Sequence, residues 1–192
     1  MSEPAGGPVR TFAVVPAGER PVRIRRTARV LMVDDRDRLL LFADSDPGLP
    51  GSSWWITTGG GVEPGESDRA AAIREVAEET GAVVMDADLI GPIAVRHAVH
   101  GYTDVIVEQG EVYFGVRVPA FEVSTAGHTA EERLTMTTHR WWTRAELAGT
   151  AHIVWPVGIL NIWEQLDLHR QNPDVFPLNL GSQQESTVQV PE

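Results

Sequence analysis

The sequence predicts a single α/β or α+β sandwich with one hydrophobic core. Three observations support this fold class. The chain has 192 residues, of which 42% are apolar, as expected for one globular domain. Strand-like segments lie on both sides of one well-defined helix, and a second helix follows late in the chain. We expect an N-terminal arm over residues 1–20, the domain over residues 21–169 and a polar C-terminal tail over residues 170–192 that the site does not need.

The strand-like segments are apolar runs or are rich in β-branched and aromatic residues. In chain order they are Ala28–Val33, Arg38–Phe42, Trp54–Thr58, Leu89–His100, Val105–Val107, Glu111–Pro119 and Arg140–Trp142. A turn over Asp34–Asp37 makes the first two segments a hairpin. Three glycines, Gly59–Gly61, break the third segment, and residues 121–138 are predicted to be a long polar loop.

Helix-boundary signals mark three helices. Ser67 is a good N-cap for a helix over Arg69–Thr80, and Gly81 is the residue expected just beyond its end. Thr143 and Glu146 form a capping box for a short helix. Pro156 favours the first turn of a third helix, which extends to Leu168.

Composition excludes several kinds of protein. There is no Cys, so disulfides, thiolate zinc sites and a cysteine nucleophile are absent. A net charge of −11 argues against a nucleic-acid partner, and any anionic ligand needs a local cation. No apolar run is long enough to span a membrane, and no secretory signal is evident. We therefore expect a cytoplasmic protein with no membrane partner.

The helix over residues 69–80 carries an unusual acidic cluster. A helical wheel places Ile73, Val76, Ala77 and Thr80 on a core stripe, and Glu75, Glu78 and Glu79 on the opposite side. Adjacent carboxylates repel one another, so a solvated acidic face is one interpretation. The other is a site for Mg²⁺ or Mn²⁺, since both cations prefer carboxylate oxygens.

The residues around this helix match a longer motif. The pattern G-x5-E-x7-R-E-U-x-E-E-x-G-U, where U is apolar, is met by Gly60, Glu66, Arg74, Glu75, Val76, Glu78, Glu79, Gly81 and Ala82. This segment resembles the Nudix box of the MutT-like hydrolases. The WWITTGGG and HRWWTRAEL segments also resemble that family, so residues 22–168 can form one Nudix fold.

The resemblance implies a fold, a reaction and a set of residues. The fold would be an α/β/α sandwich with a mixed β-sheet. The reaction would be Mg²⁺-dependent (or Mn²⁺-dependent) hydrolysis, by metal-activated water, of the pyrophosphate linkage of a nucleoside diphosphate derivative or a nucleoside triphosphate. Glu75, Glu78, Glu79 and the carbonyl of Gly60 or Gly59 would bind the metal. Arg74 would orient the glutamates, while Gly60, Glu66 and Gly81 would support the box loop.

Other candidate residues lie outside this motif. A loop acid could serve as the base in place of Glu79: Glu111 is one candidate, and Glu131 or Glu132 another. Arg26, Trp55 and Arg96 are candidates for binding substrate, against the alternatives of a solvated charge or a core tryptophan. Arg26 is placed before Arg23 and Arg25, which share the opposite strand face, because Arg26 shares the face of the apolar residues that follow. The scattered histidines make a poor zinc site.

A second function class stays open. A Nudix domain that binds a nucleotide without hydrolysing it, as a sensor or interaction module, would keep the same fold. Such modules usually lose box glutamates, whereas this sequence keeps all of them. An isomerase of the same fold would need a catalytic cysteine, which is absent. The expected partner is a nucleotide, and a homodimer is a further expectation from the family.

Overall fold

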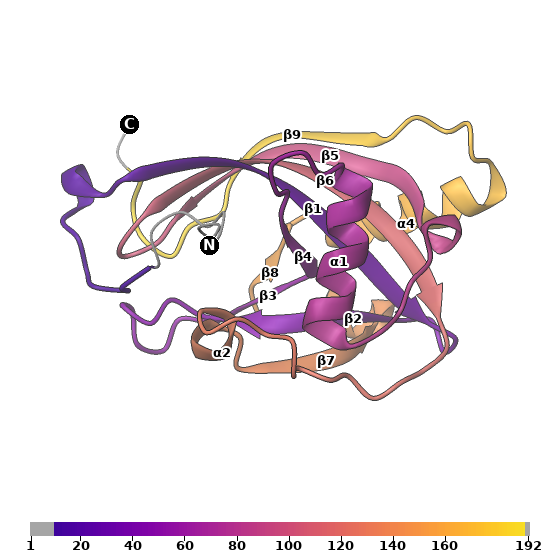
Figure 1. Ribbon diagram of the computed structural model, residues 1–192, viewed down its shortest axis with the longest axis horizontal. Helices are drawn as coiled ribbons and strands as arrows, with labels where there is room; N and C mark the ends of the chain where they lie inside the picture. Colours follow the sequence, from indigo (N-terminus) through magenta and orange to yellow (C-terminus); the bar gives the residue numbers. More distant parts are fainter. Residues whose placement is uncertain (1–9, 191–192) are drawn as a thin grey trace, which may run out of the picture.

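Strand β1 (Val22–Asp34) is the centre of the fold in the computed structural model, which describes residues 10–190 (Figure 1). One edge of β1 pairs in parallel with β6 (Ile106–Val118) along its whole length. Its other edge pairs antiparallel with β4 (Thr58–Gly61) and, further along, with β2 (Arg38–Asp44). The sheet is therefore mixed, as the resemblance implied.

The described residues form a nine-stranded sheet in the order β8-β3-β2-β1-β6-β5-β9, with β4 on β1 and β7 on β2. The remaining strands are β3 (Trp54–Ile56), β5 (Ile90–Gly101), β7 (Thr138–Thr143), β8 (Val154–Trp155) and β9 (Leu178–Gln184). The helices are α1 (Asp68–Thr80), α2 (Glu132–Thr135), α3 (Arg144–Gly149) and α4 (Ile159–Gln171). No helix among the described residues is long and apolar enough to cross a membrane.

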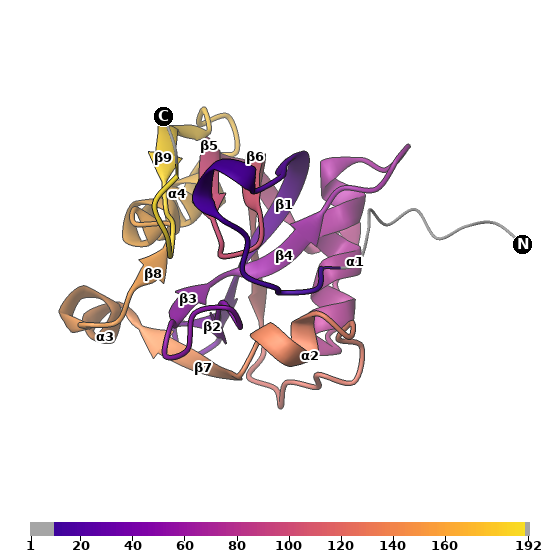
Figure 2. The ribbon, with the colours of Figure 1, turned by 90° about the vertical axis from the view of Figure 1, so that its left-hand side faces the viewer.

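Helices cover both faces of the sheet, and the alternation of side chains along β1 builds one core on each face. Ala28, Val30 and Met32 pack beneath α1, whereas Leu31 and Val33 pack with residues of α4 on the other side. Figure 2 shows α1 and α4 on opposite sides of the strands. The predicted helix–sheet–helix sandwich is confirmed.

Helix α1 has the predicted ends. The Ser67 side chain accepts a hydrogen bond from the Ala70 N–H, and Gly81, with φ 73°, donates its N–H to the Ala77 carbonyl. The predicted core stripe is partly wrong: Val76 and Thr80 are buried, but Ala77 is exposed. Glu75 and Glu79, which the wheel places opposite the core stripe, are buried, because α1 presents them to a cavity at the edge of the sheet.

Several segments extend beyond their predicted limits. The glycines over 59–61 continue as β4, residues 106–118 form one strand rather than two, and the predicted 121–138 loop contains the short helix α2. Gly59 has φ +130°, and a Cβ there would lie 2.2 Å from the Ala28 carbonyl oxygen. Only glycine allows β4 to approach β1 this closely.

The C-terminal segment is not a loose tail. Residues 178–184 form β9, which pairs in parallel with β5 and completes one edge of the sheet. The next residues continue this pairing, with the Glu185 N–H donating to the Val99 carbonyl and the Thr187 N–H donating to the Gly101 carbonyl. Strand β9 escaped prediction because its sequence, LNLGSQQ, is polar, as an edge strand can be.

The N-terminal arm is docked where it is described. The Val15 N–H donates to the Thr103 carbonyl at 2.8 Å, and Arg10 forms a salt bridge with Asp104 at 2.5 Å. A short 3₁₀ turn over Ala17–Glu19 then leads into β1. Residues 1–9 of the predicted arm lie outside the described residues.

Candidate functional site

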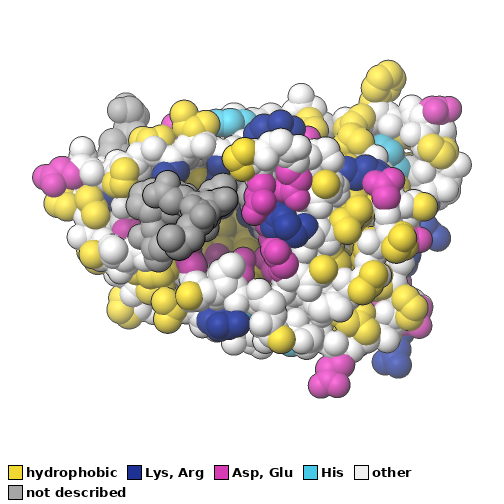
Figure 3. Space-filling view, in the orientation of Figure 1, with side chains coloured by type: hydrophobic (Ala, Val, Ile, Leu, Met, Phe, Trp, Pro, Cys, Tyr) yellow, Lys and Arg dark blue, Asp and Glu magenta, His cyan; other side chains and the backbone are white. Residues whose placement is uncertain are grey.

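A cavity of about 290 Å³ lies where α1, β4 and the α2 loop meet the N-terminal half of β1 and the facing parts of β5 and β6. One part of its lining is acidic and comes from α1 and α2. The other part carries arginines on β1 and aromatic residues after β5 and in β8. Figure 3 shows acidic side chains gathered beside a hollow on this face of the molecule.

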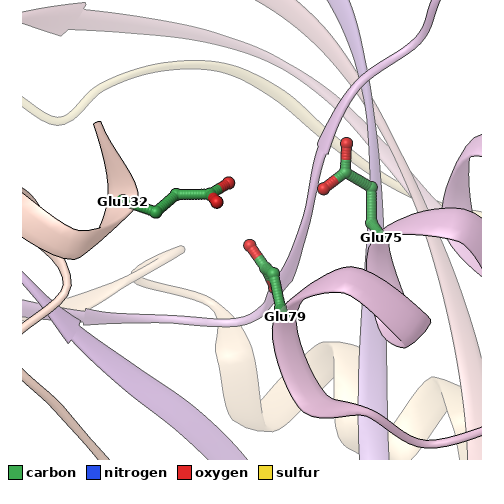
Figure 4. A group of neighbouring side chains, drawn as sticks. All are labelled: Glu75, Glu79 and Glu132. Carbon is green, nitrogen blue, oxygen red and sulfur yellow. The ribbon is translucent and has the colours of Figure 1, made fainter. Parts of the chain in front are cut away.

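Three carboxylates meet at the acidic part of the cavity (Figure 4). Glu75 and Glu79 project from successive turns of α1, and Glu132 projects from α2; one oxygen of each lies within 4.8 Å of the others. Glu79 is 2% exposed. Three converging carboxylates fit a hard divalent cation, since oxygen is the donor that such cations prefer. The sequence indicates Glu132, together with Glu131, as a candidate base and not as a metal ligand.

Burial and mutual repulsion make this cluster unfavourable when all its members are charged. Burial, then the nearby Glu75 carboxylate, raises the pKa of Glu79 well above its usual range. Burial also raises the pKa of Glu75. The Gly59 N–H donates to one Glu79 oxygen at 2.9 Å, which gives limited compensation. A bound cation would remove the repulsion and favour the ionised carboxylates.

Gly60 leaves room for this cluster. A Cβ at this position would lie 2.5 Å from a Glu75 carboxylate oxygen. The sequence pattern placed Gly60 among the metal ligands and the supporting residues, and the structure brings its backbone against the Glu75 carboxylate. A side chain at residue 60 would push Glu75 out of the cluster, which explains the need for glycine.

Arg74 organises the box without entering the cavity lining. Its guanidinium donates to Glu66, to the Gly61 carbonyl and to Glu75 at 2.7 Å. It also donates to Glu78 at 3.0 Å, and these carboxylates raise its pKa. The Glu78 side chain is 48% exposed and lies outside the group of three carboxylates. Arg74 therefore links Glu66, Glu75 and Glu78 outside the cavity lining, and the structure does not bring Glu78 into the cluster.

Glu111 lines the cavity, but its carboxylate is fully engaged. It accepts from Arg96 at 2.5 Å, from Gln109 and from the Tyr113 hydroxyl, and Arg29 lies 3.4 Å away. Burial alone would raise the pKa of Glu111, but the charges of Arg29 and Arg96 lower it to about 2. A carboxylate this acidic is a poor proton acceptor near neutral pH, so the structure favours an ion-pair role.

Of the three predicted substrate-binding residues, the structure places Arg96 at the cavity and the other two elsewhere. Arg96 lines the cavity, where it pairs with Glu111 and, at 2.8 Å, with Glu185. Arg26 points to the other face of β1, where it pairs with Asp68 at 2.6 Å outside the cavity lining. Trp55 is packed in the α4-side core, with its ring 5.0 Å from that of Trp142. Neither of these two positions supports contact with a ligand in the cavity.

The cavity also contains residues that sequence reasoning missed or ranked lower. Arg25 and Arg23 line it from the face of β1 opposite to Arg26, and other lining residues are Arg10, Arg29, Tyr102 and Trp155. Gly59 at the cavity pairs with Arg29 of β1. Side chains alternate along a strand, so Arg23 and Arg25 project toward the cavity with Arg29, whereas Arg26 projects to the other face. The sequence alone gave no signal for the strand register that decides this.

The match to known proteins agrees with this geometry. A family model described as the NUDIX domain matches residues 23–157. The uncharacterised Nudix hydrolase YvcI of Bacillus subtilis is 40% identical over 67 residues, which cover 35% of this chain and 38% of that protein. The matched part is thus well under half the length of this relative.

Solved Nudix structures share the fold. A NUDIX-family hydrolase from Clostridium perfringens superposes with a TM-score of 0.54 at 20% identity, covering 75% of this chain and 97% of that one. The MutT protein from Methanosarcina mazei gives 0.51 at 20% identity, with 80% and 99% covered. An Ap4A hydrolase from C. elegans gives 0.50 at 16% identity, with 77% and 98% covered.

These likenesses support the fold, while the family model covers the box, the glycine strand and most of the cavity wall. Three observations point to the same family. They are the match to the family model, the mixed sheet between helices, and the position of Glu75 and Glu79 of the box at the cavity. The chain therefore belongs to the Nudix family of hydrolases.

Proposed function

We propose that this protein is a metal-dependent pyrophosphohydrolase that acts on a nucleotide, with Mg²⁺ or Mn²⁺ as the cation. The observation that carries the proposal is the convergence of Glu75, Glu79 and Glu132 at a cavity that also contains arginines. Acidic residues at one part of the cavity suit a cation, and arginines further along suit the anionic groups of the same ligand.

The residues of the chain take distinct roles in this proposal. Glu75, Glu79 and Glu132 hold the cation, and Gly60 leaves the space that Glu75 needs. Arg74 fixes the Glu75 carboxylate by a direct hydrogen bond. When bound, the cation would polarise the diphosphate and make water a stronger nucleophile at neutral pH. Glu78 supports Arg74 from the solvent side in this proposal.

In this proposal the proton acceptor is a carboxylate of the cluster and not Glu111. One Glu132 oxygen accepts from the Thr129 N–H at 2.7 Å and from its hydroxyl at 2.9 Å. The other Glu132 oxygen has no hydrogen-bond donor among residues 10–190. Glu132 or Glu79 can therefore take a proton from the attacking water, while Glu111 keeps the arginines in place.

Aromatic side chains favour a nucleotide over inorganic diphosphate as the ligand. Tyr102 and Trp155 line the cavity beside His100, whose ring lies 5.3 Å from that of Trp155. Flat apolar rings at a cavity wall offer a surface for a base or a sugar. The alternative, a nucleotide sensor without hydrolysis, has no observation in its favour, since every box glutamate is present and Glu75 and Glu79 converge with Glu132.

Release of phosphate or of phosphorylated products from a panel of nucleoside triphosphates and diphosphate derivatives tests the proposal. Reactions would contain Mg²⁺, Mn²⁺ or EDTA, with the wild type, Glu79→Gln and the matched control Glu164→Gln on the exposed side of α4. We expect turnover that requires the cation, falls at least about 100-fold in Glu79→Gln and is unchanged in Glu164→Gln. Turnover that survives both EDTA and Glu79→Gln would rule out the proposed site.

A further inference from the structure

Arg10 connects the N-terminal arm to the turn between β5 and β6 and to α2. Its Nε and Nη2 donate to the two oxygens of Asp104, in that turn, at 3.0 and 2.5 Å. Its Nη1 donates to Glu131, the residue directly before α2, at 3.3 Å. The Arg10 side chain is only 12% exposed, so this is not the pairing of a solvated surface charge. One guanidinium thus joins three segments that are far apart in the sequence.

Two aromatic rings hold the Arg10 guanidinium in place. Its central carbon lies 4.7 Å from the centroid of the Phe12 ring and 4.7 Å from that of Tyr102, distances at which a ring face attracts a cation. Phe12 has φ 55°, a left-handed conformation that bulky residues rarely adopt. Such a conformation persists only where tertiary contacts support it. The path of the arm is therefore fixed where Arg10 reaches Glu131.

The third carboxylate of the cluster, Glu132, depends on how α2 is placed. This helix has four residues, too few to be stable alone. Its C-terminal end is held by Ser45, whose hydroxyl donates to the Thr135 carbonyl at 2.9 Å. Arg10 contacts its N-terminal end, where Glu131 and Glu132 lie. Because a small divalent cation accepts little variation in its distances to oxygen, a slight rotation of α2 would remove Glu132 from the site.

We propose that Arg10 is a positioning residue for the cation site: it holds the N-terminal end of α2 through Glu131 and thereby keeps Glu132 in the carboxylate cluster. Arg10 lies outside residues 23–157, the part that the family model matches, so the N-terminal arm adds this support to the shared domain. The proposal rests on the proposed function, because it takes the cluster as the cation site.

The sign of the effect on cation binding separates positioning from electrostatics. Arg10 is positively charged, so its removal would strengthen the binding of a cation if its charge alone mattered. Loss of positioning would weaken that binding instead. If Arg10 acted only by touching the substrate, binding of the cation without nucleotide would not weaken. Binding of the cation alone therefore distinguishes the three roles.

The first measurement is a calorimetric titration of the full chain with Mn²⁺, without nucleotide. We expect Arg10→Gln to weaken binding about three- to tenfold, the size of effect that one partly buried ion pair can have. Arg10→Lys keeps the charge but not the fork of donors, so it should fall between. In a Glu131→Gln background, Arg10→Gln should have little further effect.

Arg133→Gln is the matched control. Arg133 is exposed on α2, next to Glu132, and its guanidinium donates to the Ala126 carbonyl at 3.2 Å. The substitution removes the same charge from the neighbourhood of the cluster without breaking the link to the arm. It should not weaken the binding of Mn²⁺.

The second measurement follows α2 without any cation. The chain has no Cys, so a nitroxide label can be attached at one chosen position. Leu134 is 64% exposed on α2, and a label on Leu134→Cys reports the mobility of that helix. Arg10→Gln should raise this mobility, whereas a label on Glu164→Cys, on the exposed side of α4, should not change.

Several outcomes would overturn the positioning role. Mn²⁺ binding that is unchanged or stronger in Arg10→Gln refutes it, and so does weaker binding with an unchanged label on α2. If Arg10→Gln does not fold, the same criteria apply to Arg10→Lys. Failure of the proposed function is distinguishable, because Mn²⁺ binding would then be insensitive to Glu79→Gln, while the label would still show whether Arg10 holds α2.

Discussion

At the scale of single residues, Arg25 and Arg26 show how far a sequence can direct the choice of site residues. Both are candidates as anion-binding residues, and sharing a face with apolar residues favours Arg26. Both faces of β1 are apolar further along, under α1 and under α4, so apolarity does not identify the cavity side. Only the pairing of β1 with the glycine strand does so, and that contact is long-range.

A substitution at Ala77 tests directly which side of α1 is buried. Ala77 is exposed, whereas Ala72 on the same helix is fully buried between α1 and the sheet. We expect Ala77→Asp to change the free energy of unfolding by about 0.5 kcal/mol or less. The same substitution at Ala72 buries a charge and should prevent folding or lower the melting temperature severely. Circular dichroism melts of the two variants measure the difference, and severe destabilisation by Ala77→Asp would contradict the structure.

His100 makes stability depend on pH. Burial lowers its pKa from 6.5 to about 4, so the folded state binds fewer protons than the unfolded state between these values. Its contribution is present above pH 6.5 and is lost as the pH falls toward 4, with a slope of up to about 1.4 kcal/mol per pH unit. In EDTA, denaturant unfolding of His100→Gln should show a smaller loss over this range than the wild type. The exposed His97→Gln should match the wild type.

At the scale of elements, features that depend on neighbouring residues in the chain were predicted correctly, whereas features that depend on distant strands were not. The ends of α1 follow from Ser67 and Gly81, and the capping box of Thr143 and Glu146 forms as predicted. These features depend on residues within one turn. The burial of Glu75 and Glu79 could not be foreseen from a wheel, because it depends on a cavity built by distant strands.

Strand β9 is expected to be required for both stability and the cavity wall. Leu178 and Leu180 pack against the α4-side core, and Glu185, the residue that follows β9, pairs with Arg96 of the cavity wall. Removing residues 178–190 should therefore lower the melting temperature by at least about 5 °C and raise KM. Glu185→Gln keeps the strand and should raise KM with a smaller thermal effect. A truncated protein with unchanged melting and kinetics would show that β9 contributes little.

At the scale of the whole molecule, cation binding should stabilise the folded state. The carboxylate cluster forms only when α1 and α2 are brought together, so a cation that binds there favours folding. Mg²⁺ or Mn²⁺ at 100 times its Kd would add about 2.7 kcal/mol. Differential scanning fluorimetry should show a rise in melting temperature that is lost in Glu79→Gln and kept in Glu164→Gln. An equal rise in both variants would place the cation elsewhere.

The global fold was the most predictable feature, because the box residues specify a family and the family specifies a sheet between helices. Segments without apolar periodicity, such as β9 and α2, had no local signal from which they could be predicted. The oligomeric state and the cytoplasmic location stay predictions.

The late position of β9 in the chain has a consequence for synthesis of the protein. Strand β5 is made long before its partner, so its outer edge leaves the ribosome with unpaired N–H and C=O groups. Arg96 likewise waits for Glu185, some 90 residues later, before its buried charge is fully balanced. Nascent chains that stop after α4 would therefore expose an unpaired sheet edge, at which strands of other chains can pair and cause aggregation.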